Sequence, residues 1–497
     1  MKKQTITLLT ALALLLFADS ISGNNIAVTN TKVTGQNTNA GVDNPANHIL
    51  VQFDLNWENS WRTSSEPNNW DAAWVFVKYR LSGGEWQHAS LNNNGHSGTA
   101  AAIDAGLLKP GSAFNATTNP ALGVFIYRSA DGTGNFSITG AQLRWNYGAN
   151  GVPDNAIVDV KVFTIEMVVV PEGSFYLGSG GNEYGAFYKY PNTTNAYQVT
   201  SEAAIDVYSE NNLLFYPPSS HGGTRGGPIP SAFPKGYAGF YCMKYEVTQQ
   251  QYVDFLNTLT QTQANNRKYT NTLFRYAITG NTAGSYATTN PYVACTYLSW
   301  MDGAAYADWA GLRPMTELEY EKTCRGTVAP VANAYAWGNT TIVAADNITN
   351  PGAADETTNT SGANAVVAAT LYHRGPYRVG VFAKASTTRT QAGASYYGIM
   401  ELSGNLWERT VTVGNAEGRT YTGVHGNGAL SSNGYADVAA WPGLTGGEVT
   451  GADGSGFRGG NWFNGTVYAR ASDRDNAAYT YTGRGVANGF RAVRRIP

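Results

Sequence analysis

Strict alternation of apolar and polar residues in the first third of the chain restricts its fold more than any other feature. Every second residue is apolar over residues 49–57, and the same pattern returns over residues 73–81. A period of two places successive side chains on opposite faces of a strand, so both segments predict β-strands. Further strands are expected at residues 122–127, 142–147 and 157–165. Since no helical pattern interrupts this run, we predict an all-β sandwich domain over residues 24–165.

The N-terminus has the three-part pattern of an export signal. A charged start at residues 1–3 is followed by an apolar stretch at residues 6–17 and by small and polar residues at 20–23. The apolar stretch is shorter than the roughly 20 residues that span a bilayer. We therefore expect residues 1–23 to be a signal peptide and the protein to be secreted or on the cell surface. No membrane span is expected after signal removal.

Composition excludes several classes of protein. Charged residues make up only 14% of the chain and the formal net charge is -2, so no general attraction for nucleic acid is expected. There are three cysteines, an odd number and too few for a disulfide framework. The six histidines show no zinc-type spacing.

The texture of the sequence changes after residue 165. Amphipathic helices are predicted over residues 248–259, 299–311 and 316–326. Each begins with Ser or Thr followed three residues later by Gln, Asp or Glu, which is the spacing of a capping box. Beyond them the chain is rich in Gly, Asn and Thr, and we expect bound ions or aromatic packing to stabilise these irregular stretches.

Several segments occur in the order typical of one family. They are "MVVVPEGSFYLGS", "YCMKYEVTQQQYVDFL", "YLSWMDGAAYADWAGLRPMTELEYEKTCRG", "AWGN", "YGIMELSGNLWE", "RGGNW" and "NGFRAVR". Together they resemble the formylglycine-generating enzyme family, also called the sulfatase-modifying-factor family, over a domain that we place at residues 166–497. The resemblance implies an irregular α+β domain of the C-type lectin type with bound calcium. Members include oxidases that convert a sulfatase cysteine to formylglycine, and iron-dependent sulfoxide synthases.

The resemblance also shows what this chain lacks. The oxidases bind copper with two cysteines after the GG of the "RGGNW" motif, but here Asn464 stands at the first position and no cysteine follows. Copper(I) selects soft thiolates, so copper is not expected. No two histidines have the close spacing of the family's iron cluster, and there is no GxSxG motif. We assign no catalytic residue, and expect Cys324 to be a buried thiol and Glu317, Glu319 and Glu321 to serve in capping and on the helix surface.

A calcium site is implied by the segment "MELSGNLWE". By its register within the family, Glu401 and Glu408 would supply carboxylate oxygens, and Gly404 and Leu406 would supply backbone carbonyls. Calcium prefers six to eight oxygen ligands in flexible geometry. The alternative is that both glutamates pair with arginines of the C-terminal tail. Arg409 stands where the family has an aromatic residue, and a cation there lowers calcium affinity unless it points away or is paired.

A second calcium site is implied at "ADNITN". Asn347 and the Ile348 carbonyl would be ligands, while Asp355, Glu356 and Asn359 compete for the downstream position.

The C-terminal segment combines aromatic, amide and charged residues. Aromatic and Asn side chains on a rigid scaffold make good recognition surfaces because they lose little entropy on binding. The residues expected to contact a protein or carbohydrate ligand are Trp462, Asn464, Tyr468, Asp473, Asn476, Tyr479 and Tyr481. For Trp462 a place in the core is an equal alternative. The arginines of this tail favour internal bonds to carboxylates and carbonyls over an anion-binding stripe.

Three functions remain open. The first is an exported binding or assembly protein on this scaffold, which self-associates through the outward aromatics Trp74 and Phe76 of the sandwich. The second is an oxidoreductase of the same family with atypical metal ligands. The third is a retroelement-diversified receptor, because such receptors vary residues in the same region of this fold.

Overall fold

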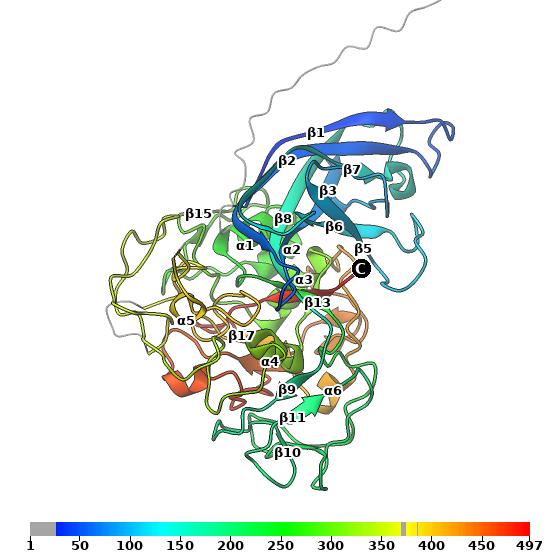
Figure 1. The fold of residues 1–497 in the computed structure, drawn as a ribbon. Helices are drawn as coiled ribbons and strands as arrows, with labels where there is room; N and C mark the ends of the chain where they lie inside the picture. Colours follow the sequence, from blue (N-terminus) through cyan, green and yellow to red (C-terminus); the bar gives the residue numbers. More distant parts are fainter. Residues whose placement is uncertain (1–25, 369–373, 385) are drawn as a thin grey trace, which may run out of the picture.

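The computed structural model describes residues 26–368, 374–384 and 386–497 (Figure 1). The predicted signal peptide, residues 1–23, lies outside the described residues. The described chain consists mostly of strands and irregular loops, with six α-helices. None of these helices is long and apolar enough to cross a bilayer.

The first part of the chain is built from long antiparallel strands, and a strand occupies every predicted position. These strands are β1 (Ala27–Asn37), β2 (His48–Arg62), β3 (Asp71–Leu81), β4 (Gln87–His88), β5 (Ala101–Leu107), β6 (Ala121–Arg128), β7 (Gly132–Trp145) and β8 (Val158–Val170). Sequence analysis missed β1 and β5. Both are edge strands of their sheets with mostly exposed or half-buried residues, so neither has a clear apolar face.

Two sheets face each other across one apolar core. The smaller has the order β1-β2-β7, and alternate residues of β2 such as Val51, Phe53 and Leu55 point into the core. The opposite side is formed by Ala73, Val75 and other residues of β3 and by β6. The alternation that predicted these strands is therefore the alternation between core and solvent on the smaller sheet.

The larger sheet contains strands from the first part of the chain and from its C-terminal region. Its strand order is β16-β21-β13-β8-β3-β6-β5, with β4 pairing to β3. The three additional strands are β13 (Phe240–Met243), β16 (Arg313–Pro314) and β21 (Ala492–Arg495). The predicted domain boundary at residue 165 falls within β8, and the division of the chain into domains stays a prediction.

The second face of β3 packs against the rest of the chain, not against solvent. Trp74 and Phe76 are fully buried. Trp74 Nε1 donates to the Ala310 carbonyl at 2.8 Å, and the Phe76 ring meets Trp309 edge-on with centroids 5.0 Å apart. The prediction that these two rings contact neighbouring subunits is therefore wrong, because a later segment of the same chain covers them.

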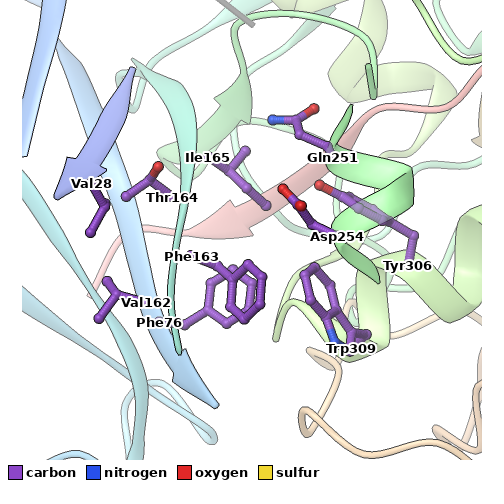
Figure 2. Close-up of a pocket in the computed structure, with 10 residues that line it drawn as sticks. All are labelled: Val28, Phe76, Val162, Phe163, Thr164, Ile165, Gln251, Asp254, Tyr306 and Trp309. Carbon is purple, nitrogen blue, oxygen red and sulfur yellow. The ribbon is translucent and has the colours of Figure 1, made fainter. Parts of the chain in front are cut away.

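A small cavity remains at this junction (Figure 2). Figure 2 shows Val28, Phe76 and Val162 on the strand side and Asp254 and Tyr306 on the helix side. Its volume of about 20 Å³ suits a single water molecule.

All three predicted helices are present. They are α1 (Gln249–Leu256), α3 (Trp300–Trp309) and α4 (Glu317–Arg325), and each has the capping box that predicted it. The structure adds the short helices α2 (Gln261–Arg267), α5 (Arg389–Ala392) and α6 (Ala416–Arg419). The remaining strands are two to four residues long: β9 (Phe175–Leu177), β10 (Tyr188–Lys189), β11 (Tyr197–Val199), β12 (Leu214–Phe215), β14 (Ile278–Thr279), β15 (Ala287–Thr288), β17 (Glu408–Val411), β18 (Leu444–Thr445), β19 (Glu448–Val449) and β20 (Ser455–Arg458).

Candidate functional site

A tight loop before β17 and the first residue of that strand carry the four residues of the first implied calcium site. Glu401, Gly404 and Asn405 all have positive φ, so the chain turns sharply here. A Cβ at Gly404 would lie 2.8 Å from the Val366 carbonyl oxygen, which is closer than any side chain tolerates. The loop therefore depends on glycine at this position.

The two glutamates of this loop each retain one buried oxygen without a hydrogen-bond partner. Glu401 Oε1 accepts from the Gly380 amide at 2.7 Å, and Glu408 Oε1 accepts from Arg491 Nε at 2.8 Å. The other oxygens, Glu401 Oε2 and Glu408 Oε2, are buried and receive no hydrogen bond. Such orphaned acceptors are costly unless a further group binds them.

A third carboxylate, which sequence analysis did not assign, lies beside them. Glu246 is fully buried and accepts from the Leu406 amide at 2.8 Å and from Asn405 Nδ2. Burial, followed by the charges of Glu408 and Glu401, raises the pKa of Glu246 well above its usual value. The segment "YEVTQQQ" predicted a helix start, and no local pattern connects its glutamate with a loop 155 residues later.

Electrostatics at this cluster favour a cation. Burial raises the pKa of Glu401 to about 7 and also raises that of Glu408, although Arg491 opposes both shifts. Arg491 acts on all three carboxyl groups, and Arg378 acts in addition on Glu401. Arg409 lies apart from these carboxyl groups. Its guanidinium stacks on Phe457 at 4.0 Å and donates to the Tyr481 carbonyl at 2.6 Å.

The loop also has backbone oxygens without hydrogen-bond partners in the described part of the chain. In addition to the two orphaned carboxylate oxygens, the carbonyls of Gly404 and Leu406 accept no hydrogen bond from any described residue. Within residues 26–368, 374–384 and 386–497, no three His, Cys, Asp or Glu side chains converge on a metal position by themselves. An ion here would therefore depend on the two carbonyls as well as on Glu401 and Glu408. The alternative pairing with arginine holds for one oxygen of Glu408.

The second implied calcium site is closed by local hydrogen bonds. Asn347 Oδ1 accepts from the Asn359 amide at 2.8 Å and from the Thr358 hydroxyl at 3.1 Å. Of the competing downstream acids, Glu356 is buried and paired with Arg275, and Asp355 accepts from Asn350 Nδ2 at 2.8 Å. The structure thus places Asn359 beside Asn347, and engages both acids elsewhere.

Three of the predicted ligand-binding residues belong to one aromatic cluster. Tyr479 and Tyr481 are each 40% exposed and stack with centroids 5.9 Å apart. Tyr479 also packs on Phe457 at 6.1 Å, which in turn meets Trp407 at 6.0 Å. Tyr468 joins through Trp407 at 6.2 Å. We call these residues, together with His221, which lies 4.4 Å from Tyr479, the aromatic surface.

The other predicted ligand-binding residues are placed differently. Trp462 is buried in the core and packs on Phe274, so the core alternative holds for it. Asp473 is also buried, and burial raises its pKa to about 7. Asn464 and Asn476 are half-buried. The Asn476 carbonyl accepts from the Phe457 amide at 2.9 Å, and this bond links Asn476 to the aromatic surface.

The aromatic surface includes residues that sequence analysis did not single out, namely Trp407, Phe457 and His221. Trp407 lies within the quoted segment "MELSGNLWE", directly before Glu408. Its ring neighbours Phe457 and Tyr468 come from segments 50 and 61 residues later, so no local pattern could have brought them together.

All three thiols are buried and free. Cys242 and Cys324 lie in the same core cluster as Ala471, and Cys295 lies in another. Burial raises the pKa of Cys242 and Cys295, and raises that of Cys324 to about 12, so none is poised as a thiolate. The prediction of a buried Cys324 is confirmed. Asn464 instead bonds to Asn461, whose Oδ1 accepts from the Asn464 amide at 3.0 Å.

The arginines of the C-terminal tail are mainly internal. Arg458 binds Glu317 at 3.0 Å and Glu321 at 2.8 Å, and Arg474 Nε binds Glu317 at 2.7 Å, all without exposed side-chain surface. The expectation that Glu317 and Glu321 lie on the helix surface is therefore wrong. They are buried because α4 packs against the tail, and the arginines neutralise their charge. Glu319 does close the capping box at Thr316.

Comparison with known proteins identifies the family. The model described as "Sulfatase-modifying factor enzyme 1-like domain" matches residues 157–496. The chain therefore belongs to this family. The match covers the aromatic surface and the segment from Glu401 to Glu408, which we call the buried acid loop.

Individual relatives are similar over shorter stretches or at low identity. A formylglycine-generating enzyme of Thermomonospora curvata is 43% identical over 56 residues, which are 11% of this chain and 18% of that enzyme. The chain thus matches less than a fifth of that relative's length. Treponema denticola variable protein 1 aligns over 67% of this chain and 96% of its own, with 12% identity and a TM-score of 0.32.

Proposed function

We propose that this protein is an exported binding or assembly protein that uses a sulfatase-modifying-factor scaffold without the family's copper chemistry. In this proposal a β-sandwich precedes a C-type-lectin-type domain that recognises a protein or carbohydrate ligand through the aromatic surface. The single observation that carries it is the location of the thiols. All three are buried in core clusters that do not include the Asn464 loop, where the resembling oxidases have a pair of cysteines. Without thiolates at that loop, copper(I) has no suitable ligands there.

The distribution of exposed apolar side chains supports binding at the C-terminal region. Of the 14 large apolar residues that are exposed among those described, four fall within residues 463–481. They are Phe463, Val467, Tyr479 and Tyr481. Exposed aromatic residues on a rigid scaffold are typical of interaction sites.

Calcium is proposed as a structural ion at the buried acid loop. Glu401 and Glu408 would each contribute their free carboxylate oxygen, and Gly404 and Leu406 their carbonyls. Calcium would supply charge neutralisation and rigidity. The loop leads directly into Trp407, so an ion there would also fix one ring of the aromatic surface.

The test combines a binding assay with an activity assay. The mature chain is measured by biolayer interferometry against immobilised extracellular proteins, with the double variant Tyr479→Ala/Tyr481→Ala beside it. We expect at least tenfold weaker binding by the double variant. Ile157→Ala, which changes an 81% exposed apolar residue outside the surface, is the matched control and retains binding.

The activity assay uses a peptide that carries the cysteine motif of a sulfatase, with and without added copper. Mass spectrometry is expected to show unchanged cysteine. Conversion of the cysteine to formylglycine, or stoichiometric copper or iron in the purified protein, would favour the oxidoreductase alternative and overturn the proposal.

A further inference from the structure

A deep groove lies where the first part of the chain meets the helices. Its volume is about 640 Å³, within the range of ligand sites. One wall comes from the β3–β4 hairpin at residues 78–88, which precedes the family match at 157–496. The other wall comes from residues 257–263, around the start of α2, and from the loop 427–430. The groove is distinct from the aromatic surface, since none of its lining residues belongs to that surface.

The floor of the groove ties its walls together. Lys78 on β3 is buried, and its amine donates to the Gly428 carbonyl at 2.6 Å. Gly428 has a φ of +86°, and a Cβ there would lie 2.3 Å from the His88 ring. Hairpin and loop are therefore held at a fixed separation, and the groove is formed before any ligand binds.

The helical wall is equally rigid. Thr258 accepts from Trp309 Nε1 at 2.8 Å, and Thr260 forms a capping box with Gln263 at the start of α2. Trp309 lines both the groove and the small cavity of Figure 2, so the groove is backed by the packed interior of the junction.

One aromatic ring is fixed at the rim. Trp86 is half-buried, with Arg80 at 4.7 Å and Lys161 at 4.9 Å from its ring centroid. The two cations attract the indole and hold it in place. Because the ring is already fixed, it loses little side-chain entropy when a ligand binds. A fixed, partly exposed indole offers a flat apolar surface for stacking.

The lining of the groove also includes two side-chain amides. Gln87 accepts from the Tyr79 hydroxyl through Oε1, and Asn427 accepts from the Ala429 amide through Oδ1. No described residue accepts a hydrogen bond from the Nε2 group of Gln87 or the Nδ2 group of Asn427. Asn427 therefore has donors available to a ligand. Gln87 pairs with Tyr79 and shares its face of the sheet, which is the face of the core between the two sheets.

The two cations that line the groove, Arg80 and Lys78, are already engaged, which argues against an anionic ligand. Arg80 pairs with Asp159 at 2.7 Å, and the Lys78 amine binds a backbone carbonyl. Burial also lowers the pKa of Lys78 to about 7, so at neutral pH this amine is protonated in only part of the molecules. The remaining chemistry is a planar ring with amide and hydroxyl groups, and this combination suits a ligand with apolar ring faces and many hydroxyls.

We propose that this groove binds a short neutral oligosaccharide, with one sugar ring stacked on Trp86 and a hydroxyl group bound by Asn427. The site does not depend on calcium or on the aromatic surface. Its loss and the loss of the proposed function are therefore separately measurable.

The test is a glycan array of neutral and acidic oligosaccharides probed with the mature chain. The best neutral hit is then titrated by calorimetry. We expect Trp86→Ala to weaken binding at least tenfold and Asn427→Ala about threefold, while Trp86→Phe retains most of the affinity. Tyr208→Ala, which changes a 44% exposed aromatic elsewhere, serves as the matched control and leaves binding unchanged.

Four results would overturn the proposal: no neutral glycan bound, unchanged affinity in Trp86→Ala, an acidic glycan or inositol hexakisphosphate bound more tightly than every neutral one, or loss of binding in Tyr479→Ala/Tyr481→Ala. A melting curve of each variant shows whether it is folded. If Trp86→Ala fails to fold, Trp86→Phe and Asn427→Ala are compared with the native chain. Affinities equal to that of the native chain in both variants would reject the site.

Discussion

The two parts of this molecule are stabilised in different ways. Between its two sheets, the first part buries an apolar core of alternating residues, and its ion pair Arg80–Asp159 is about 40% exposed. The later part has short strands and long loops, and its fully buried arginine–carboxylate pairs bind α4 to the C-terminal tail. A regular sheet satisfies its own backbone, whereas irregular loops need side chains with several donors, and arginine supplies five.

The largest effect expected from this difference comes from Glu317. This carboxylate accepts from Arg458, Arg474 and the Val413 amide, so Glu317→Ala leaves a buried guanidinium without its acid. We expect a loss of about 5 kcal/mol in unfolding free energy, measured by urea denaturation. Asp159→Ala at the exposed pair is the control and costs less than about 1 kcal/mol. Similar losses in the two variants would remove the contrast.

The next effect tests the apolar core of the first part. Leu55 is 1% exposed between the two sheets. Leu55→Ala is expected to cost about 3 kcal/mol through lost burial and the cavity left behind. Because no charge is involved, the loss stays constant between 0.05 and 1 M NaCl in the same denaturation assay. A loss that changed strongly with salt would mean that charge also stabilises this part.

The proposed calcium ion would sharpen the contrast, because all of its proposed ligands lie in the later part. Calcium at a hundredfold excess over its dissociation constant stabilises by about 2.7 kcal/mol, on the order of 5 °C in melting temperature. We expect this shift between calcium and a chelator in calorimetry of the native chain. Glu401→Gln should lose the response, whereas Glu448→Gln, at a half-exposed glutamate outside the loop, retains it. Equal melting temperatures in the native chain would refute the ion.

The smallest effect is expected where the two parts meet. Burial raises the pKa of Asp254 to about 6, so the folded state binds its proton more tightly than the unfolded state between about pH 4 and 6. Stability from this group is therefore lost as the pH rises through that window. Asp254→Asn avoids the loss and keeps the acceptor that binds Gln250 Nε2.

Thermal melts at several pH values check this effect. The Asp254→Asn variant should be about 1 kcal/mol more stable than the native chain at pH 7.5 and equal to it at pH 4. A difference that is independent of pH would show that the Asp254 carboxylate is not destabilised by the junction.

Local sequence signals predicted the parts of the fold that depend on nearest neighbours. Capping boxes located α1, α3 and α4, and alternation located β2 and β3. Helix α2 was missed because only Ala264 and Arg267 of its seven residues are buried, so it has no apolar stripe.

Features that depend on distant segments were beyond this reasoning. Trp74 lies on a strand face that alternation assigned to the outside, but α3 covers it, and α3 begins more than 220 residues later. Glu317 is buried against Arg458 and Arg474, which lie 141 and 157 residues downstream, so no local pattern indicated its burial. For the candidate site, family register located Glu401 and Glu408, whereas Glu246 and Trp407 became visible only through packing.

The place of β21 in the large sheet has a consequence for biosynthesis. Its four residues, Ala492–Arg495, leave the ribosome long after β13 and β16, yet they pair with both of these strands near the middle of the molecule. Until they arrive, β13 has an open edge that another nascent chain can pair with. A polypeptide that ended before β21 would keep that edge permanently, so the pairing of β21 is what protects β13 from such contacts.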